Sequence, residues 1–311
     1  MGIPSLPPSM TTSSTRPRVS VVMPTFRRTH IIWESINSLV AQTCKDFELI
    51  ITDDDAAGGT RDIVEQFQDP RIKYFGNEGR LGMPNNLNGG VLKAQGEFIL
   101  VCHDHDLYDR TFIERMVHLL ERHPTAAFAH AGIVFIDENG KPTGREYVMD
   151  YASLTPGKQW LAFMLSRFDC PVCANAMVRR RAYEQYGLYD TDYGFIADVE
   201  MWMRLSLHGD VGYISEPLIQ IRGRESDHEY SGINWDLTET ILCIHRLYHK
   251  RAFSGLYGLW QSMRLAGRAD VYLLKKYLAC IKRQDDFCRE TGRDYLRNSG
   301  IFLSRLVAMV L

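Results

Sequence analysis

Short apolar runs and amphipathic segments alternate regularly between residues 19 and 102, and this alternation restricts the possible fold more than any other feature of the chain. The apolar runs predict strands, and the segments between them have helical spacing. In chain order the expected elements are strand Val19–Met23, helix Ile31–Ala41, strand Phe47–Thr52, helix Thr60–Phe67, strand Ile72–Phe75, helix Leu87–Ala94 and strand Phe98–Cys102. Strands separated by helices of this length pair in parallel through right-handed crossovers. The sequence therefore predicts an α/β fold with a mostly parallel sheet.

Ionisable side chains follow the last of these strands directly, in the order His103-Asp104-His105-Asp106. Ligands bind at the carboxyl ends of strands in open α/β sheets, and two carboxylates separated by one residue can hold one divalent cation. A solvated turn explains the same spacing equally well. The strand ending at Asp53-Asp54-Asp55 delivers further carboxylates to the same sheet edge, which favours a metal or phosphate site.

Glycine-rich phosphate-binding motifs are absent from the sequence. It contains no GxxxxGK[ST] motif, and no GxGxxG follows the first strand. A bound nucleotide would therefore be held through a metal ion and side chains.

Several segments resemble, in order and spacing, the motifs of family 2 glycosyltransferases of the GT-A fold. They are Val19–Phe26, Phe47–Asp55, Asn77–Gly90, Ala94–Ile99, Asp104–Asp106, Ala197–Leu205 and Tyr213–Leu218, so the resemblance covers about residues 18–231. It implies a Rossmann-like central sheet flanked by helices. It also implies an inverting, metal-dependent enzyme that transfers a sugar from a nucleotide-sugar donor, most commonly a UDP-sugar, to a glycan or lipid-linked saccharide acceptor.

The resemblance assigns roles to residues on the donor side. Asp54 matches the carboxylate that contacts uracil, Asp104 matches the aspartate near the ribose or sugar, and Asp106 matches the ligand of Mn²⁺ or Mg²⁺. The matching residues of the nucleoside loop are Pro24, Thr25, Phe26 and Arg28. Hard oxygen ligands suit such a cation, which neutralises the charge that develops on the leaving group.

The two histidines of the segment depart from the family pattern. We expect His103 and His105 to tune the environment of the site and not to bind the metal. In an extended segment His105 would point away from its flanking carboxylates.

Asp198 matches the general base of inverting family members. Removing the proton from an acceptor hydroxyl can contribute about 10²–10⁴-fold to the rate. Ala197 replaces the glutamate that precedes this aspartate in the family, which puts the contact of that glutamate with the acceptor in doubt. The alternative is that Asp198 only caps the helix through Arg204. Glu200 would project about 200° away on a helix that begins near Ala197, which makes it a poorer base.

Basic residues near residue 225 resemble the segment that closes over the diphosphate in many relatives. His228 matches a residue that completes the metal shell, and Arg222 or Arg224 could pair with phosphate oxygens.

The sequence predicts three regions: a flexible N-terminal tail (1–17), a GT-A catalytic domain (18–232) and a basic α-helical C-terminal appendage (233–311). Residues 241–311 carry 13 Lys+Arg against 5 Asp+Glu. Helices are expected at about 237–248, 254–265, 270–288 and 295–311. A basic helical appendage favours peripheral contact with an anionic membrane. The alternatives are a solvated face packed on the catalytic domain, or an interface in a homo-oligomer.

The composition also bears on location. No run reaches the roughly 18 apolar residues that span a bilayer, and the N-terminus lacks the apolar core of a secretory signal. Seven cysteines, an odd number, suit a reducing compartment. We therefore expect a cytoplasmic protein, at the inner face of the membrane if the appendage binds lipid.

Two other functions are compatible with parts of the sequence. The His103–Asp106 segment suggests a metal phosphohydrolase, although such sites lie on helices and these residues follow a strand. The loss of glutamate at position 197 is compatible with a non-catalytic nucleotide-sugar-binding or scaffold protein. We expect no nucleic-acid partner.

Overall fold

The computed structural model describes residues 3–7, 16–168, 170–172, 175–223, 235–255, 267–269, 271–273, 275–278 and 282. The chain divides into two compact units. The first comprises Met1–Trp160 and Cys170–Arg224, and the second comprises Leu161–Asp169 and Glu225–Leu311. The short segment Leu161–Asp169 thus belongs with the C-terminal unit.

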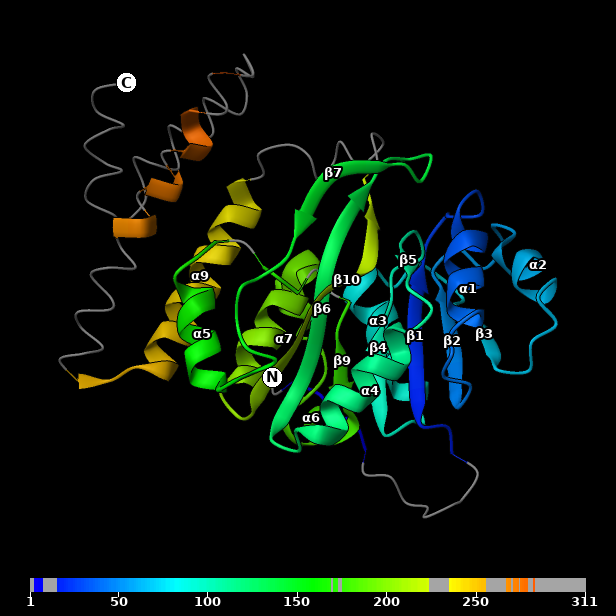
Figure 1. Cartoon of the computed structure of the whole chain (residues 1–311). Helices are drawn as coiled ribbons and strands as arrows, with labels where there is room; N and C mark the ends of the chain where they lie inside the picture. The colour runs from blue at the N-terminus through cyan, green and yellow to red at the C-terminus, as the bar shows by residue number, and fades with distance from the viewer. Residues whose placement is uncertain are drawn as a thin grey trace. The chain divides into compact units, whose positions relative to one another are not determined.

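The first unit is built around one mixed sheet (Figure 1). Its strands are β1 (Val19–Thr25), β2 (Phe47–Asp53), β3 (Ile72–Gly76), β4 (Phe98–Val101), β5 (Leu107–Tyr108), β6 (Ala126–Ile136), β7 (Pro142–Tyr147), β8 (Leu154–Thr155), β9 (Met177–Arg179) and β10 (Asp210–Arg222). They lie in the order β3-β2-β1-β4-β9-β6-β10-β5, with β7 beside β6 and β8 beside β10. Strands β3, β2, β1 and β4 pair in parallel, as the sequence predicts. Strand β9 is antiparallel to β4 and β6.

Helices α1 (Ile32–Val40), α2 (Thr60–Glu65) and α3 (Met83–Lys93) pack on the parallel half of the sheet. Helices α4 (Phe112–Arg122), α6 (Arg180–Tyr186) and α7 (Ala197–Ser206) contact β6, β9 and β10. The remaining elements are α5 (Gly157–Leu165) and the 3₁₀ helix η1 (Thr191–Ile196). Apolar side chains of α1, α2 and α4 join one core cluster with Val21 and Met23 of β1. Helix α3 lies on the opposite face, against Val22. Burial on both faces explains why these strands are continuous apolar runs.

The predicted elements up to β4 are all present, and the largest difference is the start of α3. It begins at Met83, four residues before the expected Leu87. Gly82 precedes it with a positive φ of 81°, and Pro84 lies in the first turn, where the fixed φ of proline favours a helix start. The apolar periodicity begins only after this polar first turn, so the pattern alone placed the start too late.

Gly96 marks a close approach between the turn before β4 and the backbone of β1. A Cβ atom at this position would lie 2.5 Å from the Ser20 nitrogen and 2.7 Å from the Val19 carbonyl carbon. We expect Gly96→Ala to lower the free energy of unfolding by about 1–3 kcal/mol, because the backbone must move. Urea denaturation measures the loss. Gly89→Ala in α3 is the control, since nothing lies within 4 Å of its Cβ position. An equal loss in both variants would contradict the steric explanation.

The structure describes residues 3–7 near the N-terminus and parts of the C-terminal region. Leu6 is buried and its N–H donates to the Tyr183 carbonyl oxygen, so residues 3–7 contact α6 although Pro4, Ser5 and Pro7 are exposed. The rest of the tail expected at 1–17 lies mostly outside the described residues. In the second unit, α9 (Trp235–Ala252) contains the expected helix 237–248. Residues 267–269, 271–273 and 275–278 are also helical, whereas most of the helices expected at 254–265 and 295–311 lies outside the described residues. Within the described part, the helices are too short or too polar to cross a bilayer.

Candidate active site

The candidate site lies at the carboxyl ends of β1, β2 and β4. The chain runs from β1 to β2 and β3 on one side, then returns to β4 on the other side of β1. A crevice forms at such a reversal of strand order, and ligands bind there in open α/β sheets. Thr25, Asp54 and the segment 103–106 all follow these strand ends, as the sequence predicts.

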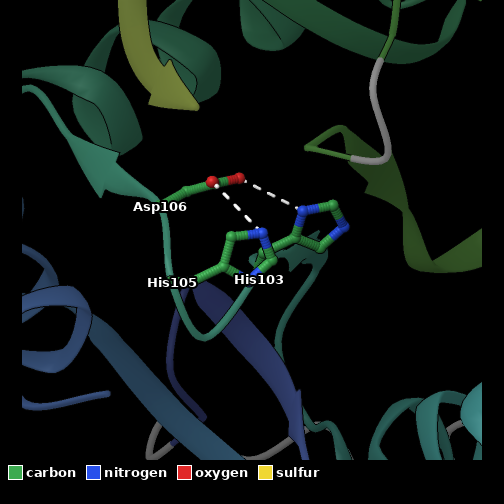
Figure 2. A group of neighbouring side chains, drawn as sticks. All are labelled: His103, His105 and Asp106. Atoms are coloured by element: carbon green, nitrogen blue, oxygen red, sulfur yellow. Dashed lines mark hydrogen bonds and ion pairs between the residues drawn. The ribbon is translucent and has the colours of Figure 1, made fainter. Parts of the chain in front are cut away.

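Asp106 is the most enclosed of the predicted site residues, with 0% of its surface exposed. Its Oδ2 accepts a hydrogen bond from Asn175 Nδ2, and its Oδ1 accepts one from the Arg222 backbone N–H, both at 3.1 Å. His103 Nδ1 lies 3.1 Å from Oδ2, and His105 Nε2 lies 3.5 Å from Oδ1 (Figure 2). Burial alone would raise the pKa of Asp106, but the two imidazoles and its hydrogen bonds lower it to about 2. The carboxylate is therefore ionised at neutral pH.

The segment 103–106 forms a turn, so the expectation that His105 points away from the carboxylates is wrong. His105 Nδ1 lies 2.9 Å from Asp104 Oδ1. The His103 and His105 rings are stacked, with centroids 5.3 Å apart. Burial raises the pKa of Asp104, but the hydrogen bond and charge of His105 outweigh burial and leave it lowered. His105 thus contacts both aspartates that flank it, and His103 contacts Asp106. The alternation of an extended strand could not predict these contacts.

Asp198 lies in the first turn of α7. Its pKa shifts in the opposite direction to the pKa of Asp106. Its Oδ1 accepts a hydrogen bond from the Val199 N–H at 2.8 Å. Burial raises its pKa to about 6, against the smaller lowering effects of that hydrogen bond and of the His103 charge. Arg204 donates to Glu200 and does not tie Asp198 to the helix. A carboxylate with this pKa can accept a proton near neutral pH.

Asp54 holds a loop at the end of β2. Its Oδ1 accepts hydrogen bonds from Asn77 Nδ2 at 2.7 Å and from the Leu81 N–H at 3.2 Å, and its Oδ2 accepts one from the Gly82 N–H at 2.9 Å. The segment 77–82 is thereby fixed beside the strand end. The contact of Asp54 with a base stays a prediction.

The loop after β1 carries an aromatic face covered by two cations. The Arg27 and Arg80 guanidinium carbons lie 5.0 Å and 4.3 Å from the Phe26 ring centroid. Pro24 is half-buried in β1, and Thr25 is buried at its end. The charge of Arg28 contributes to lowering the pKa of Asp104. These residues lie at the end of β1, and their contact with a nucleoside stays a prediction.

Arg222 is part of the scaffold of the site. Its Nε donates to the His105 carbonyl oxygen at 3.1 Å, its Nη1 donates to the Glu138 carbonyl oxygen at 2.7 Å, and its Nη2 pairs with Glu34. The guanidinium therefore already has protein partners on three nitrogens, and pairing with a phosphate stays a prediction. His228 and Arg224 lie outside the described residues.

Two residues of the site carry no motif and were not expected from the sequence. The Tyr108 hydroxyl accepts a hydrogen bond from the His103 N–H at 2.7 Å and lies 3.0 Å from Asn175 Oδ1. Asn175 in turn holds Asp106. The only local signal is that Tyr108 follows Asp106 by two residues.

Comparisons with known proteins identify the family of the chain. The model of the family described as Glycosyl transferase family 2 matches residues 20–187, which is more than half of the chain. A GalNAc(5)-diNAcBac-PP-undecaprenol beta-1,3-glucosyltransferase of Campylobacter jejuni is 40% identical over 93 residues, which are 29% of this chain and 30% of that protein. An uncharacterized glycosyltransferase of Haemophilus influenzae is 28% identical over 74% of this chain and 72% of its own length. A UDP-Glc:alpha-D-GlcNAc-diphosphoundecaprenol beta-1,3-glucosyltransferase of Escherichia coli is 31% identical over 39% of this chain and 47% of its own length.

Solved structures share the fold. TarS of S. aureus, crystallised in complex with UDP-GlcNAc, superimposes with a TM-score of 0.66 at 16% identity, over 90% of this chain and 81% of that chain. The family model covers β1 to β9, the strands whose ends carry Thr25, Asp54, Asp104 and Asp106. With the sheet, the strand ends and the family model in agreement, the chain belongs to glycosyl transferase family 2 and is a glycosyltransferase of the GT-A fold.

Proposed function

We propose that this protein is a metal-dependent, inverting glycosyltransferase that transfers a sugar from a UDP-sugar to a lipid-linked saccharide. Asp198 is the general base and Asp106 binds the cation. The observation that carries the proposal is how these two carboxylates are held. Asp106 follows β4 and accepts hydrogen bonds from Asn175 and the Arg222 N–H, and its pKa is lowered, whereas Asp198 in α7 accepts one from the Val199 N–H and its pKa is raised to about 6. This difference supports permanent negative charge on Asp106 and proton transfer by Asp198.

The chemistry is a single displacement. Asp198 removes the proton from an acceptor hydroxyl. The oxygen of that hydroxyl simultaneously forms a bond to the anomeric carbon of the donor. The bond from that carbon to the diphosphate oxygen breaks, and its electron pair leaves with the nucleoside diphosphate. A bound divalent cation would neutralise the charge on that leaving group. Asp106, ionised and fixed by Asn175 and the Arg222 N–H, suits a hard cation of this kind.

The relatives support the choice of substrates. The name of the E. coli relative specifies UDP-Glc as donor, and the names of that relative and of the C. jejuni relative specify diphosphoundecaprenol-linked or PP-undecaprenol-linked saccharides. These relatives match only parts of this chain, so the donor and acceptor classes are proposals here. An acceptor at a membrane surface agrees with peripheral contact through the basic C-terminal region.

Donor binding is the most direct test. We expect UDP-sugars with Mn²⁺ to raise the melting temperature of the full chain, because a ligand at 100 times its Kd stabilises the folded state by about 2.7 kcal/mol. GDP- and dTDP-sugars are the comparison. Release of UDP should then require a diphosphate-linked lipid saccharide. If no nucleotide sugar changes the melting temperature, or if UDP is released equally fast without acceptor, the proposed function is wrong.

A further inference from the structure

We propose that His103, His105 and Asp106 bind the cation together, and that this mixed nitrogen and oxygen site selects Mn²⁺ and related transition metals over Mg²⁺. The inference deepens the proposed function, on which it rests for the role of the cation. It replaces the expectation that the two histidines are not ligands with an alternative that can be tested. The ligand atoms of the three side chains all lie within 4.8 Å of one another (Figure 2).

The distances from the two imidazoles to Asp106 fit a shared cation. Ligand atoms about 2.0–2.2 Å from one metal ion, at angles of 90–110°, lie about 2.8–3.6 Å apart. His103 Nδ1 is 3.1 Å from Asp106 Oδ2 and His105 Nε2 is 3.5 Å from Asp106 Oδ1, and the two imidazole nitrogens lie within 4.8 Å of each other. A separation of 3.5 Å is long for a hydrogen bond between nitrogen and oxygen but is within ion-pair distance. A cation held between His105 Nε2 and Asp106 is compatible with the same separation.

Asp104 orients His105 as a metal ligand. Ligating histidines commonly donate their other ring N–H to a carboxylate, which fixes the tautomer. In the contact of 2.9 Å between His105 Nδ1 and Asp104 Oδ1, a proton on Nδ1 donates to Asp104, and the lone pair of Nε2 is then available to a metal ion. Arg222 Nε holds the His105 carbonyl oxygen, and Asn175 holds Asp106. Asp104 is then a positioning residue, and His105 supplies the ligand atom.

The ligand types decide which cation is preferred. Mg²⁺ favours oxygen ligands and retains water, whereas imidazole nitrogen suits transition metals. Two imidazoles and one carboxylate therefore favour Mn²⁺ over Mg²⁺, and Co²⁺ or Zn²⁺ over Mn²⁺ by the general order of affinities. A site made of carboxylates alone would discriminate less between Mn²⁺ and Mg²⁺.

Pulsed EPR of Mn²⁺ bound to the wild-type full chain tests the ligands without any substitution. We expect ¹⁴N couplings from two imidazoles, and we expect a hundredfold excess of Mg²⁺ to leave most of the Mn²⁺ bound. Affinity measured from the free Mn²⁺ signal should fall at least about tenfold in His103→Gln and in His105→Gln. Asp104→Asn should lose about 10–100-fold through the orientation of His105. Melting curves in EDTA verify that each variant is folded.

His118→Gln is the matched control, because His118 is exposed on α4 and should leave Mn²⁺ affinity unchanged. Bound Mn²⁺ without ¹⁴N coupling, or wild-type affinity in both histidine variants, would overturn the proposed ligand set while leaving nucleotide-sugar binding intact. Nitrogen coupling in a protein that binds no nucleotide sugar would support the metal site and contradict the proposed function. The two failures are therefore distinguishable.

Discussion

Asp198→Asn should lower the turnover of sugar transfer by about 10²–10⁴-fold while leaving donor binding within a factor of about two, because the amide keeps the shape of the side chain but cannot accept the acceptor proton. Initial rates of UDP release with acceptor, and melting shifts with UDP-sugar and Mn²⁺, measure the two quantities. Asp192→Asn is the control, since Asp192 is exposed in η1, just before α7. Turnover of Asp198→Asn within tenfold of the wild type would exclude Asp198 as the base.

The same substitution should stabilise the fold at neutral pH. The pKa of Asp198 is about 6 in the folded protein, above its ordinary value of 3.8, because burial penalises the charged form. The folded state therefore loses stability as pH rises from about 4 through about 6, by at most about 3 kcal/mol. The amide introduced by Asp198→Asn carries no charge and avoids this loss. Urea denaturation in EDTA should give equal stabilities near pH 4 and a more stable variant at pH 7. A variant that is less stable at pH 7 would contradict the burial argument.

A gain in stability together with a loss of activity distinguishes a base from a structural carboxylate. A carboxylate kept for the fold stabilises it through partners, and removing that carboxylate destabilises the protein. Asp198 has the Val199 N–H as a hydrogen-bond partner, and its environment still favours the neutral form. A charged group that destabilises the fold but serves the reaction creates a trade-off, because removing it raises stability and lowers activity.

Local patterns predicted the parallel half of the sheet because each of its elements is continuous in sequence. The runs that became β1, β2 and β4 are apolar on both faces, and the helices between them have a period of 3.6. The β9-β6-β10 half was not assigned strand by strand. Strand β10 runs for 13 residues with irregular register against β6, and β9 has only three residues. Such pairings depend on contacts between distant segments.

The position of the candidate site could be predicted in part, for a similar reason, whereas the roles of its residues stay predictions. Asp54, Asp104, Asp106 and Asp198 could be named because strand ends and a family motif mark them. The hydrogen-bond partners of Asp106 could not be named from the sequence. Asn175 and Arg222 lie 69 and 116 residues away from it. In the turn at 103–106 both imidazoles lie beside Asp106, and its contacts come from the nearby Tyr108 as well as from these distant partners.

Glu200→Ala should lower the free energy of unfolding by about 3–5 kcal/mol, because it leaves a buried charge without its partner. Glu200 is 1% exposed, and its carboxylate accepts hydrogen bonds from Arg204 Nε and Nη2 at 3.0–3.2 Å. Denaturation in urea measures the loss. Glu97→Ala is the control, since the Glu97 side chain is 54% exposed in its ion pair with Arg18 and should contribute less than about 1 kcal/mol. A loss below about 1 kcal/mol in Glu200→Ala would contradict the role of the pair.

A double variant separates the charge from the packing of this pair. In Glu200→Met with Arg204→Met no charge is left buried, but the Tyr186 and Leu188 carbonyl oxygens lose the Arg204 donors. We therefore expect a loss of about 1–3 kcal/mol, smaller than that of Glu200→Ala. Glu200→Ala should also keep wild-type turnover per folded molecule at low temperature, whereas Asp198→Asn should not, although both residues lie in the first turn of α7. Equal losses of turnover per folded molecule would mean that the position of the helix, and not a proton acceptor at Asp198, limits the reaction.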